Sequence, residues 1–481
     1  MSTFVRTLRS IMNRTEPKAN LISLENTITS GGDERIELIH DGLNKYHINP
    51  CDNQGVFNRG TCTCSVLTDE AKERVSYLFN GFKDETISFE EVRKEQVKSL
   101  KRLLNNVDFN YNVFFAPSGS DLCYYPILFS KLINPNKPIM SLVTCPEELG
   151  SGSAMANQGH FFSEKNQILP NVVKGESVNP DISVEYKSFN ARDEAGVILD
   201  HHESIKSTIR KYKDDYSIIG NLVIGSKSGI EDNISIIEEC QEDVLWVVDL
   251  CQLRTSRDLL QKLLKLNCLV MVTGSKFYQS PPFCGALLVP EKINTALAHS
   301  KPETWGFDKV YTKYDFPTEL GELREKFIDY KNYGLLLRWE CAVTEMKLLS
   351  NYKESVVNVT ISRWNQHMTE LLLDSPYFDL MLDQEKTNSS IISFRVKVNG
   401  AYLSHEQLQT LHKAIVNEPP PLLPKFRKLI IGQPVAYGDN SFIRFAIGSH
   451  NVRKLLDNDM DLTNDTRLVE TIERLIKERR Y

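Results

Sequence analysis

The sequence predicts an α/β protein, with a large domain built on a mostly parallel β-sheet and a smaller α+β domain towards the C-terminus. Three patterns predict this fold class. Short apolar runs alternate with helical periodicity between about residues 110 and 290, a long helical stretch follows, and beyond Ser375-Pro376 the pattern changes to short strands. Apolar strands that alternate with helices are typical of a parallel sheet covered on both faces.

The predicted strands of the large domain are short runs rich in Val, Ile and Leu. We expect strands over Tyr111–Ala116, Pro138–Thr144, Ser183–Phe189, Ser217–Ile224, Val244–Val248 and Cys268–Thr273. Helical periodicity lies between the strands, as at Leu259, Leu260, Leu263 and Leu264.

The C-terminal part begins with a long helix, expected from Phe327 to about Tyr352. Two strands follow, over Ile391–Val398 and Phe442–Ile447, with a Pro-rich joint and a loop at Ile431–Val435 between them. A charged amphipathic helix is expected over about Thr466–Arg479. These elements are enough for a second, smaller domain reached through the long helix.

Length and composition describe an ordinary globular protein. The chain has 481 residues, 41% of them hydrophobic, with a net charge of −6. A chain this long exceeds one compact core. We therefore expect an N-terminal arm (1–65), a large domain (66–330), and an interdomain helix with a small domain (331–481). No basic block offers a nucleic-acid surface, and no apolar run approaches the roughly 20 residues that cross a bilayer.

The ten cysteines are scattered, and residues 1–20 lack the apolar core of a secretory signal. Free thiols in a reducing compartment are therefore expected, which favours the cytoplasm. Arg6, Arg9 and Arg14, with Ser and Thr around them, leave a mitochondrial targeting segment as the alternative to a plain N-terminal arm.

The first candidate site segment is Ser118-Gly119-Ser120-Asp121, which follows a predicted strand. Small residues turn the chain, and a helix begins. Backbone N–H groups at a helix N-terminus bind anions, and the Ser120 hydroxyl can add a hydrogen bond. A plain helix cap would have the same sequence.

The second candidate is Asp249, which follows a wholly apolar strand. A carboxylate in such a place is costly unless a cation meets it. A protonated pyridine nitrogen is one such cation, and Gln252 is close enough to reach a hydroxyl on the same ring. The alternative is that Asp249 caps the next helix.

The third candidate is Thr273-Gly274-Ser275-Lys276, also at the end of a predicted strand. A lysine in a dry pocket has a lowered pKa, so its amine is free to form an imine. Thr273 and Ser275 are placed to donate hydrogen bonds to a phosphate. One helix and one strand fit between Asp249 and Lys276, so the two side chains are expected at the ends of successive strands, facing one ligand. A surface lysine is the alternative. The rival Lys227 lies upstream of Asp249.

Together these segments resemble fold-type-I pyridoxal-5′-phosphate (PLP) enzymes, and most closely the class V aminotransferase and cysteine desulfurase superfamily. Val247–Gln252 is similar to the strand-Asp-x-x-Gln/His motif of that family. Thr273–Tyr278, followed by Gly285–Val289, resembles its Ser-x-His-Lys motif and the next strand, with Ser275 in place of the common His.

Other segments match the family more loosely. Ser226 stands where the family often has Asn, and Glu148 lies on the loop that normally stacks an aromatic or His ring on the cofactor. Arg444, on the predicted strand Phe442–Ile447, resembles the arginine that binds the substrate carboxylate; pairing with a surface acid is the alternative. A substrate contact is the lesser interpretation of Arg59, behind a structural role. No cysteine occurs from Asn351 onwards, which argues against the persulfide mechanism of desulfurases.

The resemblance implies a homodimeric PLP enzyme that acts on a small amino acid, with no metal. Lys276 would carry the cofactor as a Schiff base and then move protons, and Asp249 would hold the pyridinium. The phosphate would bind at Ser118, Gly119, Ser120, Thr273 and Ser275, the ring oxygen at Gln252 and Ser226, and the substrate at Arg444 and Glu148. Class V transamination is expected. A PLP-dependent lyase that cleaves C–S or C–C bonds, a decarboxylase, and a non-catalytic partner-binding homologue are the alternatives.

Overall fold

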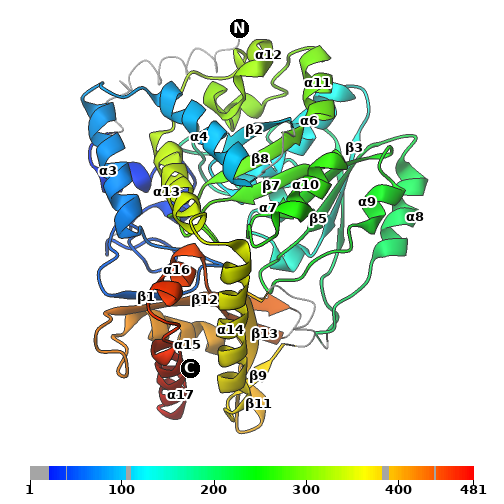
Figure 1. Ribbon diagram of the computed structural model, residues 1–481. Helices are drawn as coiled ribbons and strands as arrows, with labels where there is room; N and C mark the ends of the chain where they lie inside the picture. The colour runs from blue at the N-terminus through cyan, green and yellow to red at the C-terminus, as the bar shows by residue number, and fades with distance from the viewer. Residues whose placement is uncertain (1–20, 40, 105–109, 195, 382–388, 438–439) are drawn as a thin grey trace.

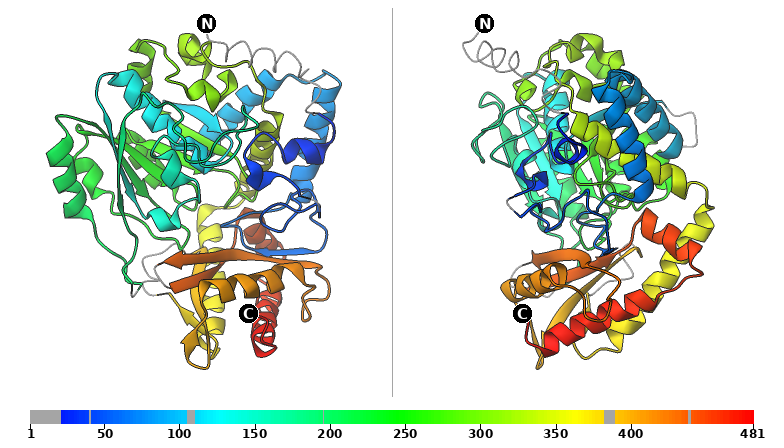
Figure 2. Two further views of the ribbon diagram at one scale, coloured as in Figure 1. Left: turned by 180° about the vertical axis from the view of Figure 1, so that it is seen from behind. Right: turned by 90° about the vertical axis from the view of Figure 1, so that its left-hand side faces the viewer.

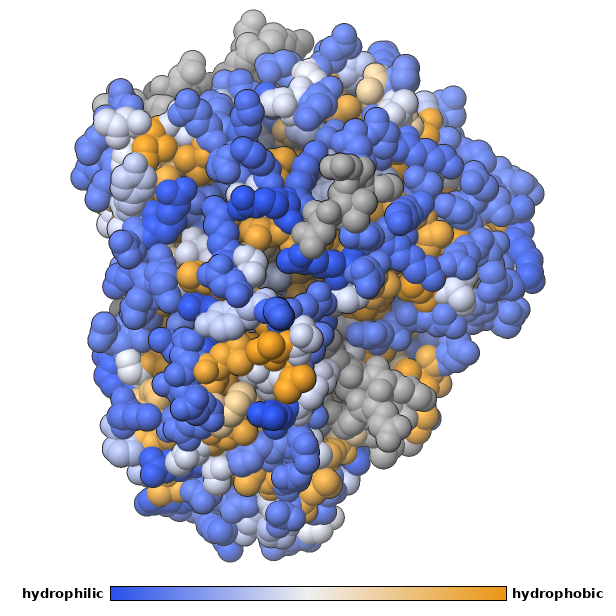
Figure 3. All heavy atoms as spheres, viewed as in Figure 1, coloured by the Kyte–Doolittle hydropathy of each residue, from blue (hydrophilic) through white to orange (hydrophobic). Residues whose placement is uncertain are grey.

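The computed structural model describes residues 21–39, 41–104, 110–194, 196–381, 389–437 and 440–481. It has two lobes, each built on its own β-sheet (Figures 1 and 2). The larger lobe contains a seven-stranded sheet, and the smaller lobe contains a six-stranded sheet. Hydrophilic side chains cover most of the face seen in Figure 3.

The large sheet has the strand order β2-β8-β7-β6-β5-β3-β4. All neighbouring strands are parallel except β8, which pairs antiparallel with both β2 and β7. The structure confirms every predicted strand of this domain to within two residues at either end. The strands are β2 (Tyr111–Ala116), β3 (Ile139–Thr144), β4 (Val184–Phe189), β5 (Ser217–Val223), β6 (Val244–Leu250), β7 (Leu269–Thr273) and β8 (Gly285–Pro290).

Apolar side chains cover both faces of this sheet, as expected for buried parallel strands. Along β7, Val270 and Val272 belong to one hydrophobic cluster, whereas Leu269 and Met271 belong to another on the opposite face. Helices from different parts of the chain cover the two faces. The helices of this lobe are α2 (Leu24–Ile28), α3 (Asp69–Lys83), α4 (Phe89–Leu104), α5 (Gly119–Leu122), α6 (Tyr124–Ile133), α7 (Ser153–Ala156), α8 (His202–Tyr212), α9 (Ser235–Glu239), α10 (Arg257–Lys265), α11 (Glu291–His299), α12 (Gly321–Arg324) and α13 (Tyr333–Leu349).

The smaller lobe has a sheet of order β1-β12-β13-β10-β11, with β9 also paired to β10. Its first strand comes from the N-terminal arm, because β1 pairs in parallel with β12. The arm therefore belongs to both lobes. The strands are β1 (Val56–Arg59), β9 (Phe378–Leu380), β10 (Ile391–Val398), β11 (Ala401–Tyr402), β12 (Lys428–Tyr437) and β13 (Asn440–Ala446), and the helices are α14 (Glu354–Leu373), α15 (His405–Asn417), α16 (Ser449–Asp457) and α17 (Thr463–Lys477).

Two differences from the sequence prediction concern the C-terminal part of the chain. The long helix predicted from Phe327 begins at Tyr333, where Asn332 caps it by accepting the amide of Leu335, and a second long helix, α14, follows it into the smaller lobe (Figure 1). The sequence also suggested a loop at residues 431–435. These residues lie in β12, and the pairing register shifts between Gly432 and Val435, as at a β-bulge. No helix among the described residues is long and apolar enough to cross a membrane.

Candidate active site

A cavity of about 190 Å³ lies where the parallel strands of the large sheet end and the smaller lobe faces them. In an open α/β sheet, the carboxyl ends of the strands are the usual place for a ligand. Every residue of the predicted cofactor and substrate site lines this one cavity. They are Ser118, Gly119, Ser120, Glu148, Ser226, Asp249, Gln252, Thr273, Ser275, Lys276 and Arg444.

Lys276 follows β7 and extends its partly buried side chain into the cavity. Its Nζ donates a hydrogen bond to the backbone oxygen of Thr63, at 2.9 Å. Desolvation lowers the pKa of Lys276, and the positive charge of Arg444 lowers it further, although nearby thiols act in the opposite direction. Such an amine is more easily deprotonated, and therefore more nucleophilic, than a surface lysine. The surface-lysine alternative is wrong.

Asp249 lies in β6, directly across from Met271 of β7. Its Oδ1 accepts a hydrogen bond from the backbone amide of Cys251 at 2.8 Å. Desolvation raises the pKa of this carboxyl group, and the Lys276 cation lowers it, so the two side chains interact electrostatically. The helix-cap alternative for Asp249 is wrong, because Ser256 caps α10, the next helix.

The turn after β2 brings small residues against the ends of β6 and β7. Ser118 caps α5: its Oγ accepts the amide of Asp121 at 3.2 Å and donates to the Asp121 carboxylate at 2.6 Å. A Cβ on Gly119 would lie 2.9 Å from the Cys251 sulfur, so a larger residue would have to displace the Cys251 side chain. Ser120 Oγ lies 3.4 Å from the hydroxyl of Ser153.

The side chains that were expected to bind a phosphate differ in their hydrogen bonds. Thr273 Oγ1 donates to the backbone oxygen of Cys251 at 2.7 Å. In contrast, the Ser275 hydroxyl is fully buried at the cavity wall and has no hydrogen-bond partner among the described residues. Gln252 is held by the backbone oxygen of Cys62, at 3.4 Å, and by Arg254, at 3.2 Å.

Glu148 and Ser226 form a closed cluster at one wall of the cavity. Glu148 pairs with Arg192 at 3.3 Å, and both side chains are completely buried. The other carboxylate oxygen accepts hydrogen bonds from the hydroxyls of Ser226 and Ser228 and from the Ser228 amide. The protein itself thus satisfies the Glu148 carboxylate, which gives Glu148 a structural role in shaping the wall.

Arg444, on β13, is buried at the cavity and meets only neutral groups. It donates to the backbone oxygens of Lys227 at 3.0 Å and Gln433 at 3.1 Å, and to the Thr63 hydroxyl at 3.2 Å. Its Nε has no partner, and no ion pair to Arg444 exists within the described part of the chain. The alternative of an arginine paired with a surface acid is wrong.

Sequence reasoning missed several cavity residues that come from distant segments. Arg35 and Tyr46, from the N-terminal arm, line the cavity together with Phe283. Arg35 is paired with Asp33 at 2.7 Å, stacks over the Phe283 ring at 4.6 Å, and reaches Ser118 Oγ at 3.4 Å. No local motif marks these residues, because the arm reaches the cavity only through tertiary contacts.

The Arg59–Cys64 segment contains both a residue with a structural role and residues that line the cavity. Arg59 forms a buried ion pair with Asp465 at 2.6 Å, which supports the structural interpretation of this arginine. Cys62 and Thr63 line the cavity, and Thr63 contacts both Lys276 and Arg444. The segment therefore connects the catalytic lysine candidate to the arginine of the smaller lobe.

Comparison with solved structures places the chain in a known fold. An alanine–glyoxylate aminotransferase from Nostoc sp. aligns with a TM-score of 0.57 at 13% identity, over 89% of this chain and 97% of that chain. A cysteine desulfurase from Escherichia coli aligns with a TM-score of 0.54 at 12% identity, over 87% and 94%. A C-DES variant with glycine covalently linked to its PLP cofactor gives 0.53 at 13% identity, over 85% and 97%. These likenesses confirm the predicted fold. The sequence matches no protein-family model and no curated protein.

Proposed function

We propose that this chain, which has the fold of class V aminotransferases and cysteine desulfurases, is a PLP-dependent enzyme that transfers the amino group of a small amino acid. Lys276 holds the cofactor as a Schiff base. One observation carries the proposal: Asp249 and Lys276, at the ends of adjacent strands, open into one cavity together with a buried arginine that has no acidic partner among the described residues. The C-DES structure of the same fold carries PLP.

The residues present fit PLP. The buried Ser275 hydroxyl, which has no partner in the described part of the chain, and the glycine-lined turn at Gly119 supply donors and space for the phosphate. The half-buried Asp249 carboxylate, whose pKa is raised by desolvation, gains a cation when it meets the pyridine nitrogen. Arg35, whose charge is balanced by Asp33, lies beside Ser118 and brings further N–H donors to this end. Gln252 lies within reach of the ring oxygen.

When bound, PLP supplies an electron sink for the negative charge that develops at the substrate Cα. Lys276 moves the Cα proton, because its lowered pKa makes a neutral amine available as a base at Nζ. The hydrogen bond to Thr63 orients this amine. Arg444 binds the substrate carboxylate, since a buried guanidinium that meets only carbonyl and hydroxyl groups gains most from an anion.

The alternatives differ in which bond of the substrate breaks. A lyase or a decarboxylase of this fold would use the same cavity. A non-catalytic scaffold is disfavoured because it has no need of both Asp249 and Lys276, which line one cavity. The ten cysteines form no disulfide, which fits a reducing compartment such as the cytoplasm. The resemblance also implies a homodimer, which light scattering on the purified protein tests.

Spectroscopy on the purified protein tests the proposal. We expect yellow protein that binds PLP, an amino-acid-dependent change in the cofactor spectrum, and a keto acid as product when an acceptor keto acid is present. Release of CO2 or of a side-chain fragment would assign a decarboxylase or a lyase instead. Colourless protein that takes up no PLP would contradict the proposal and favour the scaffold.

A further inference from the structure

A second lysine, Lys227, lies in the same cavity and has no role in the chemistry described so far. It follows β5, on the loop that also carries Ser226, and its side chain is partly buried. Its Nζ donates to the backbone oxygen of Glu147 at 3.3 Å, and no carboxylate lies within ion-pair distance among the described residues. Lys227 thus lines the cavity with no ion-pair partner in the described part of the chain.

The surroundings of Lys227 make its charge costly. Desolvation lowers the pKa of Lys227 to about 8, and the neighbouring Arg444 and Lys276 cations lower it too, whereas Glu148 and Glu147 raise it. Of these two acids Glu148 has the larger effect, and its carboxylate is already paired with Arg192. An anion that entered the cavity beside Lys227 would relieve this cost and stabilise the protonated amine.

The charges around the cavity can be matched one by one. Arg35 pairs with Asp33, and Glu148 pairs with Arg192. Under the proposed function, the phosphate binds at the Ser118–Ser120 turn and Ser275, Asp249 meets the pyridinium, Lys276 carries the cofactor, and Arg444 binds the α-carboxylate. Of the four lysine and arginine side chains that line the cavity (Arg35, Lys227, Lys276 and Arg444), Lys227 is then the one to which no anion is assigned.

The backbone of Lys227 is also hydrogen-bonded to Arg444. The Nη1 of Arg444 donates to the backbone oxygen of Lys227 at 3.0 Å, which holds the loop of the larger lobe against the arginine of the smaller lobe. The Arg444 charge also lowers the pKa of Lys227, so the two cations lie close enough to interact.

We propose that Lys227 binds a second acidic group on the side chain of the substrate. The substrate class is then an acidic α-amino acid, with either a carboxylate or a phosphate on its side chain. This inference rests on the proposed function and narrows it from small amino acids in general to anionic ones.

Paired ligands test this inference. The absorbance change of the PLP-loaded protein gives the dissociation constants of aspartate against asparagine, glutamate against glutamine, and O-phosphoserine against serine. We expect at least one acid to bind about 10- to 100-fold more tightly than its neutral partner, since a charge-assisted hydrogen bond replaces a neutral one. The best acid identifies the side-chain group.

Lys227→Met should remove this preference by weakening the acid and leaving the neutral partner unchanged. Lys187→Met is the matched control, because Lys187 lies on β4 of the same sheet, bonds to Thr208 and does not line the cavity. Equal or tighter binding of the neutral ligands to the wild-type protein would overturn the inference without any variant, even if Lys227→Met failed to fold. Equal weakening of both ligands in Lys227→Met would overturn it too. If the proposed function itself is wrong, no amino acid will change the cofactor spectrum. This outcome is distinct from a spectrum that changes equally with acidic and neutral ligands.

Discussion

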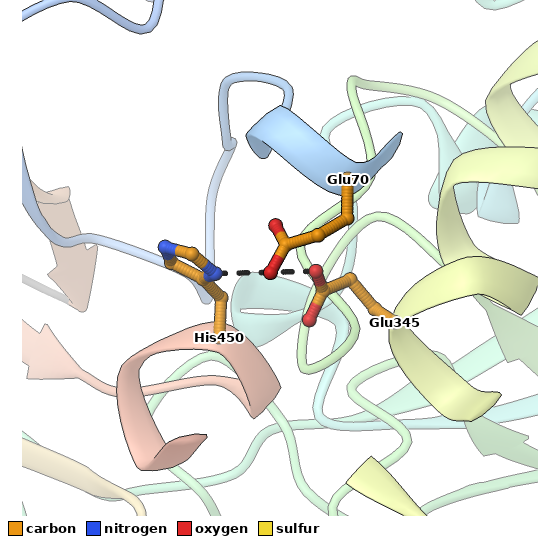
Figure 4. Close-up of side chains that lie close together, drawn as sticks. All are labelled: Glu70, Glu345 and His450. Carbon is orange, nitrogen blue, oxygen red and sulfur yellow. Dashed lines mark ion pairs between the residues drawn. The ribbon is translucent and has the colours of Figure 1, made fainter. Parts of the chain in front are cut away.

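Two clusters of charge join the lobes of this molecule, and they differ in how their charges are satisfied. In the first cluster, Glu345 of α13, Glu70 of α3 and His450 of α16 converge (Figure 4). Arg453 lies among them and donates to Glu345 at 2.9 Å and to Glu70 at 3.2 Å. In the second cluster, at the cavity, the hydrogen bonds that Lys227, Lys276 and Arg444 donate to described residues all go to neutral groups.

This difference in charge pairing indicates a different role for each cluster. Glu345 also accepts hydrogen bonds from Thr68 at 2.9 Å and Ser449 at 3.2 Å, so its buried carboxylate is fully satisfied by the protein. The two glutamates and His450 are arranged like metal ligands, but both glutamates already pair with the Arg453 guanidinium. We infer that the first cluster, whose charges pair with one another, stabilises the contact between the lobes. The second cluster, called the open cluster below, consists of cations without an acidic partner among the described residues and is suited to bind an anionic ligand.

Among the variants of the open cluster, Lys276→Ala should have the largest effect on turnover. Without the amine, the chain loses both its covalent link to PLP and the base for the Cα proton, so turnover should fall to background. Lys187→Ala should keep wild-type turnover. Steady-state assays of both variants check this, and retained turnover in Lys276→Ala would move the Schiff base elsewhere, with Lys227 the next candidate.

Asp249→Ala should weaken PLP binding by about 3–5 kcal/mol, because the cationic ring would lose its partner in a desolvated site. Equilibrium titration of the apoprotein with PLP measures this loss. Asp243→Ala is the control, since Asp243 is an exposed residue just before the same strand and pairs with Lys213 at its surface. Unchanged PLP affinity in Asp249→Ala would remove this residue from the site.

A pair of arginine variants tests the comparison itself. Arg453→Met leaves Glu345 buried without a cation and should lower the free energy of unfolding by about 3–5 kcal/mol. Arg444→Met breaks no ion pair and should lower it by no more than about 1–2 kcal/mol, because cavity water can reach the freed carbonyls. Urea unfolding of the two variants without substrate measures both values. Equal losses of unfolding free energy in the two variants would contradict the distinction between paired charges at Arg453 and an unpaired charge at Arg444.

The smallest expected effect is a dependence on pH. Succinate and butyrate differ by one carboxylate and contain no amine, so their relative inhibition reports the second cation. The pKa of Lys227 is lowered to about 8, so the amine loses its proton as the pH rises through that value. Between about pH 7 and pH 9 the preference for succinate should therefore fall up to about 10-fold. A preference that is constant or grows with pH would contradict the role of Lys227.

The strands and the residues at their ends were predictable from the sequence, because the chemistry of a buried strand and its terminal polar residue is local. Asp249, Ser275 and Lys276 belong to this group. The β12 strand was missed because Gly432 and Pro434 are typical of a loop, whereas here they lie at a register shift.

Other parts of the site depend on contacts that no local pattern carries. Arg35 and Thr63 reach the cavity only because the N-terminal arm packs against both lobes. The engagement of Glu148 by Arg192, and the absence of an acid beside Arg444 in the described structure, are also tertiary facts. The sequence could therefore nominate site residues but could not tell a satisfied charge from an unsatisfied one.

Reduction of the PLP-loaded protein with borohydride, followed by peptide mapping, tests the central claim most directly. We expect a stable pyridoxyl label on the peptide that contains Lys276, and no label when that lysine is replaced by alanine. A label on Lys227, on a lysine outside the cavity, or on no lysine at all would contradict the assignment of the Schiff base to Lys276.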